Sequence, residues 1–348
     1  MNKRMILYIQ GAILLIESAI MVLPIATALI YREPAGVWFF YTALAAAICG
    51  FAAMKLSKPR TKTIYAKEGL ITVALGWIVL SLVGALPFTL SGEIPFYLDA
   101  VFEMISGFTT TGSSILPNVE ALSRCMLLWR SFSHWLGGMG ILVFMLAIVK
   151  MEGGQGIHLL RAESPGPTVG KMVPRMVDSS KILYTIYFAL TLVQVVFYLA
   201  GGMPLFDSLC NAFATAGTGG FSIKADSFAS YSPYLQTVTT VFMALFGVNF
   251  SIYFFLLQKK FDLAFKNTEL RWYVGIILFS IAMITANILP MYPDFHAAIH
   301  HAAFSVSSVI TTTGFGTENF DLWPEFSRVI LVFLMIVGAS AGSTGGGL

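Results

Sequence analysis

Long apolar stretches alternate with short polar ones along this chain, and this alternation leaves few folds open to it. Stretches of spanning length run at about 5–31, 36–54, 69–90, 126–149, 182–201, 234–257 and 273–290, with a shorter eighth at about 326–338. Only 11% of the 348 residues are charged, against roughly 25% in a typical soluble domain. An apolar stretch of about 20 residues can cross a bilayer as a helix. The sequence therefore predicts an all-α integral membrane protein.

Three shorter apolar segments are too short to span, and each leads into a run of Thr and Gly. The segments lie at roughly 95–108, 204–215 and 294–310. The runs, called here the first, second and third run, are Thr109–Gly112, Ala216–Gly219 and Thr311–Gly314. Non-helical backbone at membrane depth is tolerated only where it is buried in protein or lines a wet cavity. We therefore expect repeated helix–pore-loop–helix units, as in potassium channels, preceded by two extra transmembrane helices.

The runs favour a selectivity filter. Backbone carbonyls of such a strand can replace the hydration shell of a potassium ion, and glycine adopts the φ values that let successive carbonyls face one way. The alternative is a helix C-cap followed by a turn, and the threefold repetition favours the filter. The candidate filter residues, and the only expected metal contacts, are Thr110, Thr111, Gly112, Gly217, Thr218, Gly219, Thr312, Thr313 and Gly314.

An aspartate lies near the start of each short segment, at Asp99, Asp207 and Asp294. There it can cap free backbone N–H groups and complement the positive end of the helix dipole. The opposite end of each short helix would then face the pore axis, which favours a cation.

The basic residues predict the orientation. Residues 3–4, 55–67, 150–181 and 259–271 hold 16 of the 21 Lys and Arg residues. By the positive-inside rule these four segments are cytoplasmic. The N-terminus is then cytoplasmic, and each of the three runs lies toward the outside.

A cluster of small residues interrupts the last apolar stretch. It contains Gly338, Gly342, Ser343, Thr344, Gly345, Gly346 and Gly347. Each Gly costs up to about 1 kcal/mol relative to Ala in a helix, so the cluster breaks the helix, and broken helices next to binding sites are common in transporters. A frayed terminus is the alternative.

Other polar residues carry weaker signals. Glu17 lies inside the first apolar stretch, where we expect a hydrogen bond to a neighbouring helix. We expect His134 to be a packing residue, and the helical spacing of His296, His300 and His301 gives no zinc site without more acids or a nearby Cys. The sequence contains no HExxH, GxSxG or P-loop pattern, so we do not expect an enzyme.

Several motifs together resemble the membrane subunit of Trk-type potassium uptake systems, within the Trk/Ktr/HKT superfamily. They are Ser106–Gly112, His134–Gly140, Arg161–Pro167, Thr215–Ser222, Thr311–Thr317 and Gly342–Gly347. The resemblance covers essentially the whole chain. It implies potassium uptake across a bacterial cytoplasmic membrane, with the glycine cluster beneath the filter as an intramembrane gating loop. It also implies a homodimeric membrane part and a cytosolic nucleotide-binding regulatory subunit, with no cofactor in this chain.

The resemblance also implies a division of the chain. We expect a two-helix unit at 1–62, a first repeat at 63–150, a second at 151–262 and a third, incomplete, at 263–348. The family has four repeats, and no fourth Thr/Gly run is present, so we expect the chain to be truncated before that repeat. A non-conducting fragment that acts as a structural partner, and a sodium-conducting or sodium-coupled relative, therefore remain alternatives. The sequence leaves open whether transport is channel-like or coupled to protons or sodium.

Overall fold

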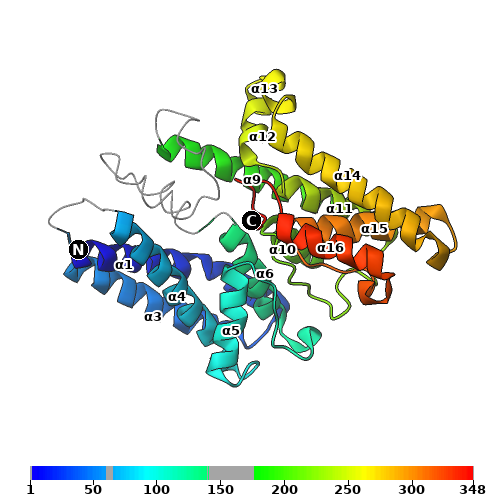
Figure 1. Cartoon of the computed structure of the whole chain (residues 1–348). Helices are drawn as coiled ribbons and strands as arrows, with labels where there is room; N and C mark the ends of the chain where they lie inside the picture. Colours follow the sequence, from blue (N-terminus) through cyan, green and yellow to red (C-terminus); the bar gives the residue numbers. More distant parts are fainter. Residues whose placement is uncertain (1, 60–65, 139, 141–175, 348) are drawn as a thin grey trace. The chain divides into compact units, whose positions relative to one another are not determined.

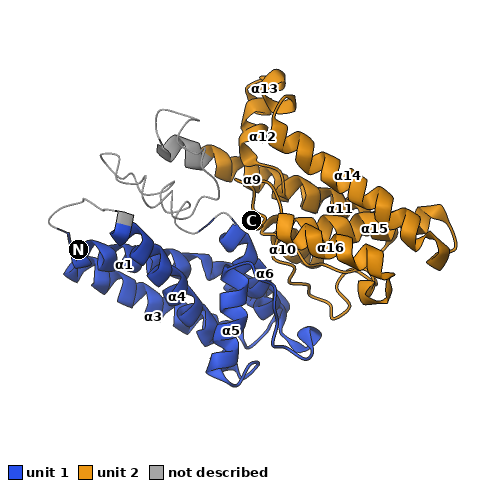
Figure 2. Cartoon of the chain, in the orientation of Figure 1, with its two compact units in different colours: residues 1–164, 169–181 blue, residues 165–168, 182–348 orange. Residues whose placement is uncertain are grey.

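The computed structural model describes residues 2–59, 66–138, 140 and 176–347. Within these residues the secondary structure is entirely helical, with no strand, which confirms the predicted all-α fold. The chain forms two compact units, whose helices are labelled in Figure 1 and which are coloured separately in Figure 2. Unit 1 comprises residues 1–164 and 169–181, and unit 2 comprises residues 165–168 and 182–348.

Unit 1 pairs long helices with one short one. Its elements are α1 (Lys3–Ile20), α2 (Val22–Tyr31), α3 (Gly36–Leu56), α4 (Ala66–Ser91), α5 (Tyr97–Phe108), η1 (Val119–Ala121) and α6 (Arg124–Gly138). Helix α1 packs along α3 and α4, and the short helix α5 packs against α4 and α6.

Unit 2 contains two short helices of the same kind, α10 and α15. Its elements are α9 (Met176–Ala200), of which residues 176–181 belong to unit 1, α10 (Leu205–Ala216), α11 (Pro233–Phe246), α12 (Phe250–Leu257), α13 (Phe261–Phe265), α14 (Thr268–Ile288), η3 (Leu289–Met291), α15 (Phe295–Ile310), η4 (Phe320–Leu322) and α16 (Glu325–Val337). Helix α15 contacts α11, α14 and α16, and α10 contacts α11.

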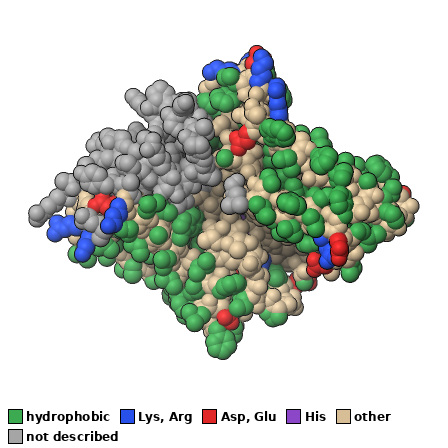
Figure 3. Space-filling model, in the orientation of Figure 1, with side chains coloured by type: hydrophobic (Ala, Val, Ile, Leu, Met, Phe, Trp, Pro, Cys, Tyr) green, Lys and Arg blue, Asp and Glu red, His purple; other side chains and the backbone are tan. Residues whose placement is uncertain are grey.

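Several helices are long and apolar enough to cross a membrane. In the described part of the chain five pass this test, at Lys3–Tyr31, Gly36–Leu56, Lys67–Ser91, Ile182–Ala200 and Thr268–Met291. Large apolar side chains are exposed on their outer faces, among them Leu29, Phe51 and Phe279. Hydrophobic side chains cover much of the visible surface in Figure 3. Exposed apolar surface on this scale marks contact with lipid or with other proteins.

The predicted short segments are confirmed, because α5, α10 and α15 match them within two residues at each end. The predicted span 234–257 is not one straight helix. The chain bends by 89° between α11 and α12, where Gly247 is the C-cap residue of α11 and Asn249 caps α12 by accepting a hydrogen bond from the Ser251 N–H. Residues 141–149 of the predicted span 126–149 and the motif Arg161–Pro167 lie outside the described residues.

Candidate functional site

The short helix α5 ends in a turn that places a threonine in the left-handed region. The N–H of Thr110 donates to the carbonyl of Gly107 at 3.1 Å, and the N–H of Thr111 donates to that of Ser106 at 2.9 Å. These two bonds define the Schellman motif, in which the residue after the C-cap adopts a left-handed conformation. Thr110 is that residue, with φ +55°.

Helices α10 and α15 end in the same way. In α10, Thr218 N–H donates to Thr215 O and Gly219 N–H to Ala214 O. In α15, Thr312 N–H donates to Val309 O and Thr313 N–H to Ser308 O. The sequence offsets equal those in α5. We call the equivalent four-residue segments the first, second and third cap: Thr109–Gly112, Gly217–Gly220 and Thr311–Gly314.

A threonine occupies the left-handed position in all three caps. Thr218 has φ +51° and Thr312 has φ +58°, close to the value at Thr110. Glycine is the usual residue there because it has no Cβ, and a β-branched residue in this conformation is an outlier. Such strain costs of order 1–3 kcal/mol per residue and collects at functional sites. Because this strain is repeated three times, the caps are the candidate site.

The equivalence corrects the sequence alignment by one residue in the second run. Gly112 and Gly314 have positive φ values of +78° and +85°, as predicted. In the second cap Gly220, not Gly219, has positive φ, at +78°. The prediction that Gly219 is the equivalent glycine is therefore wrong. Helix α10 ends at Ala216, so Gly217 corresponds to Thr109 and Thr311.

The first and third caps share a pair of threonine hydroxyl groups that the second cap lacks. The hydroxyls of Thr109 and Thr111 lie 2.8 Å apart, and those of Thr311 and Thr313 lie at the same distance. Thr109 and Thr311 also donate to helix carbonyls four residues earlier. Glycine stands at both equivalent positions of the second cap, so this brace is absent there.

The second and third caps lie against each other in unit 2. A Cβ added to Gly220 would lie 2.0 Å from the carbonyl oxygen of Thr313, so only glycine fits there. The structure thus brings together Gly217–Gly219 and Thr312–Gly314 of the predicted site. Thr110, Thr111 and Gly112 belong to unit 1.

Residues 338–347, which the sequence predicts to form an intramembrane loop and which keep that name below, reach both caps of unit 2. The Thr218 hydroxyl donates to the carbonyl of Thr344 at 2.8 Å. The N–H of Gly346 donates to the Thr312 hydroxyl at 2.9 Å. The left-handed threonines of the two caps therefore hydrogen-bond to this loop.

The loop is closed on itself. Gly338 ends α16 with φ +70°, and a Cβ there would lie 2.3 Å from the carbonyl oxygen of Gly346. The N–H of Ala339 donates to the same carbonyl at 2.9 Å. Ser343 and Thr344 are buried. This ordered turn does not resemble a frayed helix end.

The first cap is supported by a buried ion pair. Arg130 of α6 donates from Nε to Glu103 of α5 at 2.5 Å, and both side chains are 3% exposed or less. The same carboxylate accepts from the Ser114 hydroxyl at 3.0 Å and from the Ile115 N–H at 3.0 Å. Glu103 thus ties the chain that follows the first cap to the helix that precedes it.

The motif at the end of α6 packs on the first cap. His134 is fully buried and donates from Nδ1 to the carbonyl of Gly107 at 2.9 Å, which fits the packing role predicted for it. Gly137 lies so close that a Cβ there would meet the Phe108 carbonyl oxygen at 2.2 Å. Only glycine allows this approach.

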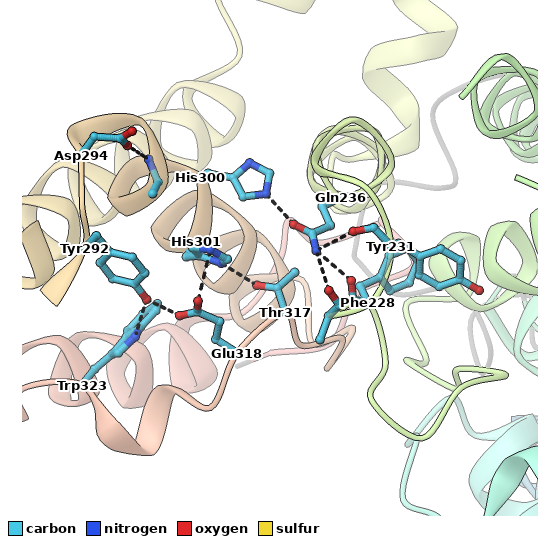
Figure 4. Close-up of polar contacts among 12 residues, drawn as sticks. Phe228, Tyr231, Gln236, Tyr292, Asp294, His300, His301, Thr317, Glu318 and Trp323 are labelled. Atoms are coloured by element: carbon cyan, nitrogen blue, oxygen red, sulfur yellow. Dashed lines mark hydrogen bonds and ion pairs between the residues drawn. The ribbon is translucent and has the colours of Figure 1, made fainter. Parts of the chain in front are cut away.

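The contact directly behind the third cap is a neutral hydrogen bond. The Ser308 hydroxyl donates to the Phe315 carbonyl at 2.6 Å. Farther along, His301 of α15 hydrogen-bonds to Thr317 through Nδ1 at 3.1 Å, and its Nε2 lies 3.2 Å from Glu318 (Figure 4). Tyr292 also donates to Glu318. Together these contacts fix the chain that follows the third cap.

Figure 4 also shows how α11 and α15 are linked. His300 donates from Nε2 to Gln236 at 2.7 Å, and the Gln236 amide donates to the carbonyls of Phe228 and Tyr231. His300 and His301 therefore bind different partners. The described residues contain no group of three His, Cys, Asp or Glu side chains placed to hold a metal ion.

The predicted aspartate caps are confirmed at one helix of three. Asp294 is the N-cap of α15 and accepts from the Ala297 N–H at 2.7 Å. Asp99 and Asp207 lie in the first turns of α5 and α10, whose N-cap residues make no side-chain cap bond. There they can complement the helix dipole, and Asp207 also accepts a hydrogen bond from the Tyr231 hydroxyl at 3.4 Å.

The hydrogen bond expected for Glu17 is not found. Its side chain is fully buried, and neither carboxylate oxygen has a hydrogen-bond partner among the described residues. Glu17 approaches Gly84 of α4, where an added Cβ would lie 3.3 Å from Oε1.

Sequence reasoning missed several residues that hold the site. These are Glu103, Arg130, Gln236, Asn249 and Glu269. Their partners are backbone groups or side chains far away in the sequence, so no short motif contains them. The one available signal was the placement of Glu103 and Arg130 within apolar segments, where charged residues are rare.

Comparisons with known proteins agree with the motifs. The profile of the TrkH family, described as "Cation transport protein", matches residues 38–348. A "Trk system potassium uptake protein TrkH" from Escherichia coli strain K12 is 36% identical over 355 residues, covering 100% of this chain and 73% of that protein. An uncharacterized cation transporter from Methanocaldococcus jannaschii is 31% identical, covering 99% and 69%. The crystal structure of the potassium transporter TrkH from Vibrio parahaemolyticus superimposes with a TM-score of 0.87 at 32% identity, covering 100% and 72%.

Proposed function

The chain belongs to the TrkH family of cation transport proteins, and on that premise we propose that it carries potassium ions into the cell across the cytoplasmic membrane. Relatives that bear the name Trk system potassium uptake protein align with the whole chain. The apolar helices suit a multi-pass membrane protein.

One observation carries this proposal: three short helices end in the same strained cap. A threonine in the left-handed region is costly, and a chain that only had to end a helix would use glycine. Carbonyl groups that follow such a turn can point in a common direction and coordinate a dehydrated cation. Three equivalent caps would supply three walls of an ion path.

The proposed filter keeps the predicted residues of the first and third runs and shifts the second. Its residues are Thr110, Thr111, Gly112, Thr218, Gly219, Gly220, Thr312, Thr313 and Gly314. Gly217 would then serve as the helix C-cap, as Thr109 and Thr311 do.

The intramembrane loop is the proposed gate. Its support is a pair of hydrogen bonds: the Thr218 hydroxyl donates to the Thr344 carbonyl, and the Gly346 N–H donates to the Thr312 hydroxyl. Small residues and glycines with positive φ at 338, 342 and 347 would let the loop change shape at low cost.

Orientation, partners and internal boundaries follow from the charge pattern and the family. We infer a cytoplasmic N-terminus, a bacterial inner-membrane location, and repeats that divide near residues 62, 150 and 262. A homodimer and a cytosolic nucleotide-binding regulatory subunit are the partners that the family resemblance implies. The equivalence of the three caps supports the repeat division.

Replacement of Gly314 by Ser tests the filter. No atom lies within 4 Å of a Cβ added there, so the side chain fits and only the positive φ is strained. That strain of about 1–2 kcal/mol should lower the ratio of rubidium to sodium uptake about tenfold in the complete protein. Gly275→Ser, in α14, is the control because it has equal space and no positive φ. A ratio unchanged in Gly314→Ser, with normal uptake, would remove the third cap from the ion path.

A further inference from the structure

The intramembrane loop is bound along the break between α11 and α12. The N–H of Ser340 donates to the carbonyl of Gly247 at 3.0 Å, and the N–H of Phe250 donates to the carbonyl of Gly342 at 2.9 Å. Thr344 donates to the Phe246 carbonyl from its hydroxyl at 3.2 Å. The free backbone groups of the broken helix therefore hydrogen-bond to the loop.

A carboxylate from a third helix joins this contact. Glu269 lies in the first turn of α14. Its Oε1 accepts the Ala341 N–H at 2.6 Å, and its Oε2 accepts the side-chain amide of Asn249 at 3.1 Å. Asn249 is 7% exposed and uses its own oxygen to cap α12 at Ser251. One side chain thus connects the loop, the helix break and α14.

The chemistry of this position requires a carboxylate. Both partners of Glu269 are N–H donors, and an ionised carboxylate presents an acceptor to each. A glutamine has one acceptor oxygen and one NH₂ group, so it could satisfy Ala341 only by turning its donor toward the Asn249 amide. Hydrogen bonds to a charged acceptor are also roughly twice as strong as neutral ones.

We propose that Glu269 is a positioning residue for the gate, whose carboxylate holds Ala341 and so keeps the intramembrane loop in its closed position. This inference rests on the proposed function. The loop is held at three places: residues 344 and 346 at the caps, residues 340, 342 and 344 at the helix break, and Ala341 at Glu269. Release at Ala341 leaves residues 340 and 342 bound to the helix break by single backbone hydrogen bonds.

A pair of substitutions exchanges the hydrogen-bond donor and acceptor between positions 249 and 269. Glu269→Gln leaves two amide donors facing each other, and Asn249→Asp brings two carboxylates together while it keeps the cap on Ser251. The double variant Glu269→Gln/Asn249→Asp restores the pair, because the glutamine donates to the aspartate and accepts from Ala341. A purely structural role for either residue does not predict this rescue.

Rubidium uptake into proteoliposomes that contain the complete protein, without the regulatory subunit, measures how strongly the loop restricts ion flow. We expect about tenfold faster uptake for each single variant, equivalent to about 1.4 kcal/mol, since each variant disrupts the pairing of Glu269 with Asn249. The double variant should return to within about twofold of the wild type. Asp262→Asn is the control, because this side chain is 87% exposed on neighbouring α13 and its loss removes one charge. The proposed role of Glu269 would be overturned if both single variants took up rubidium at the wild-type rate. It would also be overturned if the double variant were as fast as the single variants.

A second measurement does not depend on transport. Ser343 is buried in the loop, so a Ser343→Cys variant, with Cys49, Cys125 and Cys210 replaced by Ala, should react slowly with a water-soluble thiol reagent. Glu269→Gln, or Asn249→Asp if the former does not fold, should speed this reaction about tenfold. An unchanged reaction rate would overturn the inference. If the wild-type protein moves no rubidium, the proposed function fails, and the labelling rates alone decide whether Glu269 holds the loop.

Discussion

The first and third caps have the same backbone and the same paired threonine hydroxyls, yet the structure behind them differs. Behind the first cap lies a buried ion pair, in which Glu103 binds Arg130 and the chain at Ser114 and Ile115. Behind the third cap the Ser308 hydroxyl binds the Phe315 carbonyl, and no charge is buried in that contact. The geometry of the cap is thus compatible with two different kinds of support.

The difference separates the interactions that determine the backbone conformation of the cap from those that only stabilise it. The Schellman bonds and the left-handed threonine occur in all three caps. The hydroxyl brace occurs in two. The ion pair occurs behind one. A charged support fails differently from a neutral one, because loss of one partner leaves an uncompensated buried charge.

Removal of Arg130 should have the largest effect on stability. Arg130→Met leaves the Glu103 carboxylate buried without its counterion, so we expect a loss of about 3–5 kcal/mol in the free energy of unfolding. Unfolding in mixed detergent micelles with increasing SDS measures it. The double variant Glu103→Gln/Arg130→Met should recover most of the loss, since glutamine can still accept from Ile115. Equal stability of Arg130→Met and the wild type would break the distinction between the two supports.

A Cβ at the second cap should have the next largest effect. Gly220→Ala forces an L-residue to φ +78° and places its Cβ 2.0 Å from the Thr313 carbonyl oxygen. We expect a cost of about 2–3 kcal/mol by the same unfolding measurement. Gly219→Ala is the matched control and should cost less, because Gly219 does not have positive φ. The reverse order would restore the alignment predicted from the sequence.

The neutral support of the third cap offers a smaller test. Ser308→Ala removes the bond to Phe315 and should cost about 1 kcal/mol. Ser106, at the equivalent position before the first cap, has a buried hydroxyl without a hydrogen-bond partner among the described residues. Ser106→Ala should therefore be neutral or slightly stabilising. Equal losses in the two variants would show that Ser308 does not support its cap.

Loss of one hydroxyl from the threonine pairs of the first and third caps should have the smallest effect. The effect should be equal in the two caps. Thr111→Val and Thr313→Val keep the side-chain shape and remove one hydroxyl of each pair. A loss of about 0.5 kcal/mol corresponds to roughly a twofold fall in the ratio of rubidium to sodium uptake. A fall in only one of the two variants would show that the caps contribute unequally to selectivity.

The sequence predicts the short helices well and the register of one cap poorly. Apolar length separates α5, α10 and α15 from the spanning helices without any tertiary information. Three glycines lie near Thr218, at positions 217, 219 and 220, and composition does not say which one has positive φ. That choice depends on where α10 ends, at Ala216, and helix ends are set by backbone bonds that any residue can make.

The supports of the site are the least predictable part. Glu269 lies in a basic segment that the sequence assigns to the cytoplasm, and its partner Ala341 offers only a backbone N–H. No residue type at position 341 could have signalled that bond. Gly247 and Asn249 indicated the break after α11, but the apolar residues on both sides led to the prediction of a single span.

We propose that the caps themselves bind the transported cation. Crystals of the complete protein grown in rubidium and measured near the rubidium absorption edge would reveal this binding. We expect anomalous density within coordination distance of the backbone carbonyls of the second and third caps, at Thr218 and Thr312. Rubidium density elsewhere along the ion path, with none at these carbonyls, would contradict it.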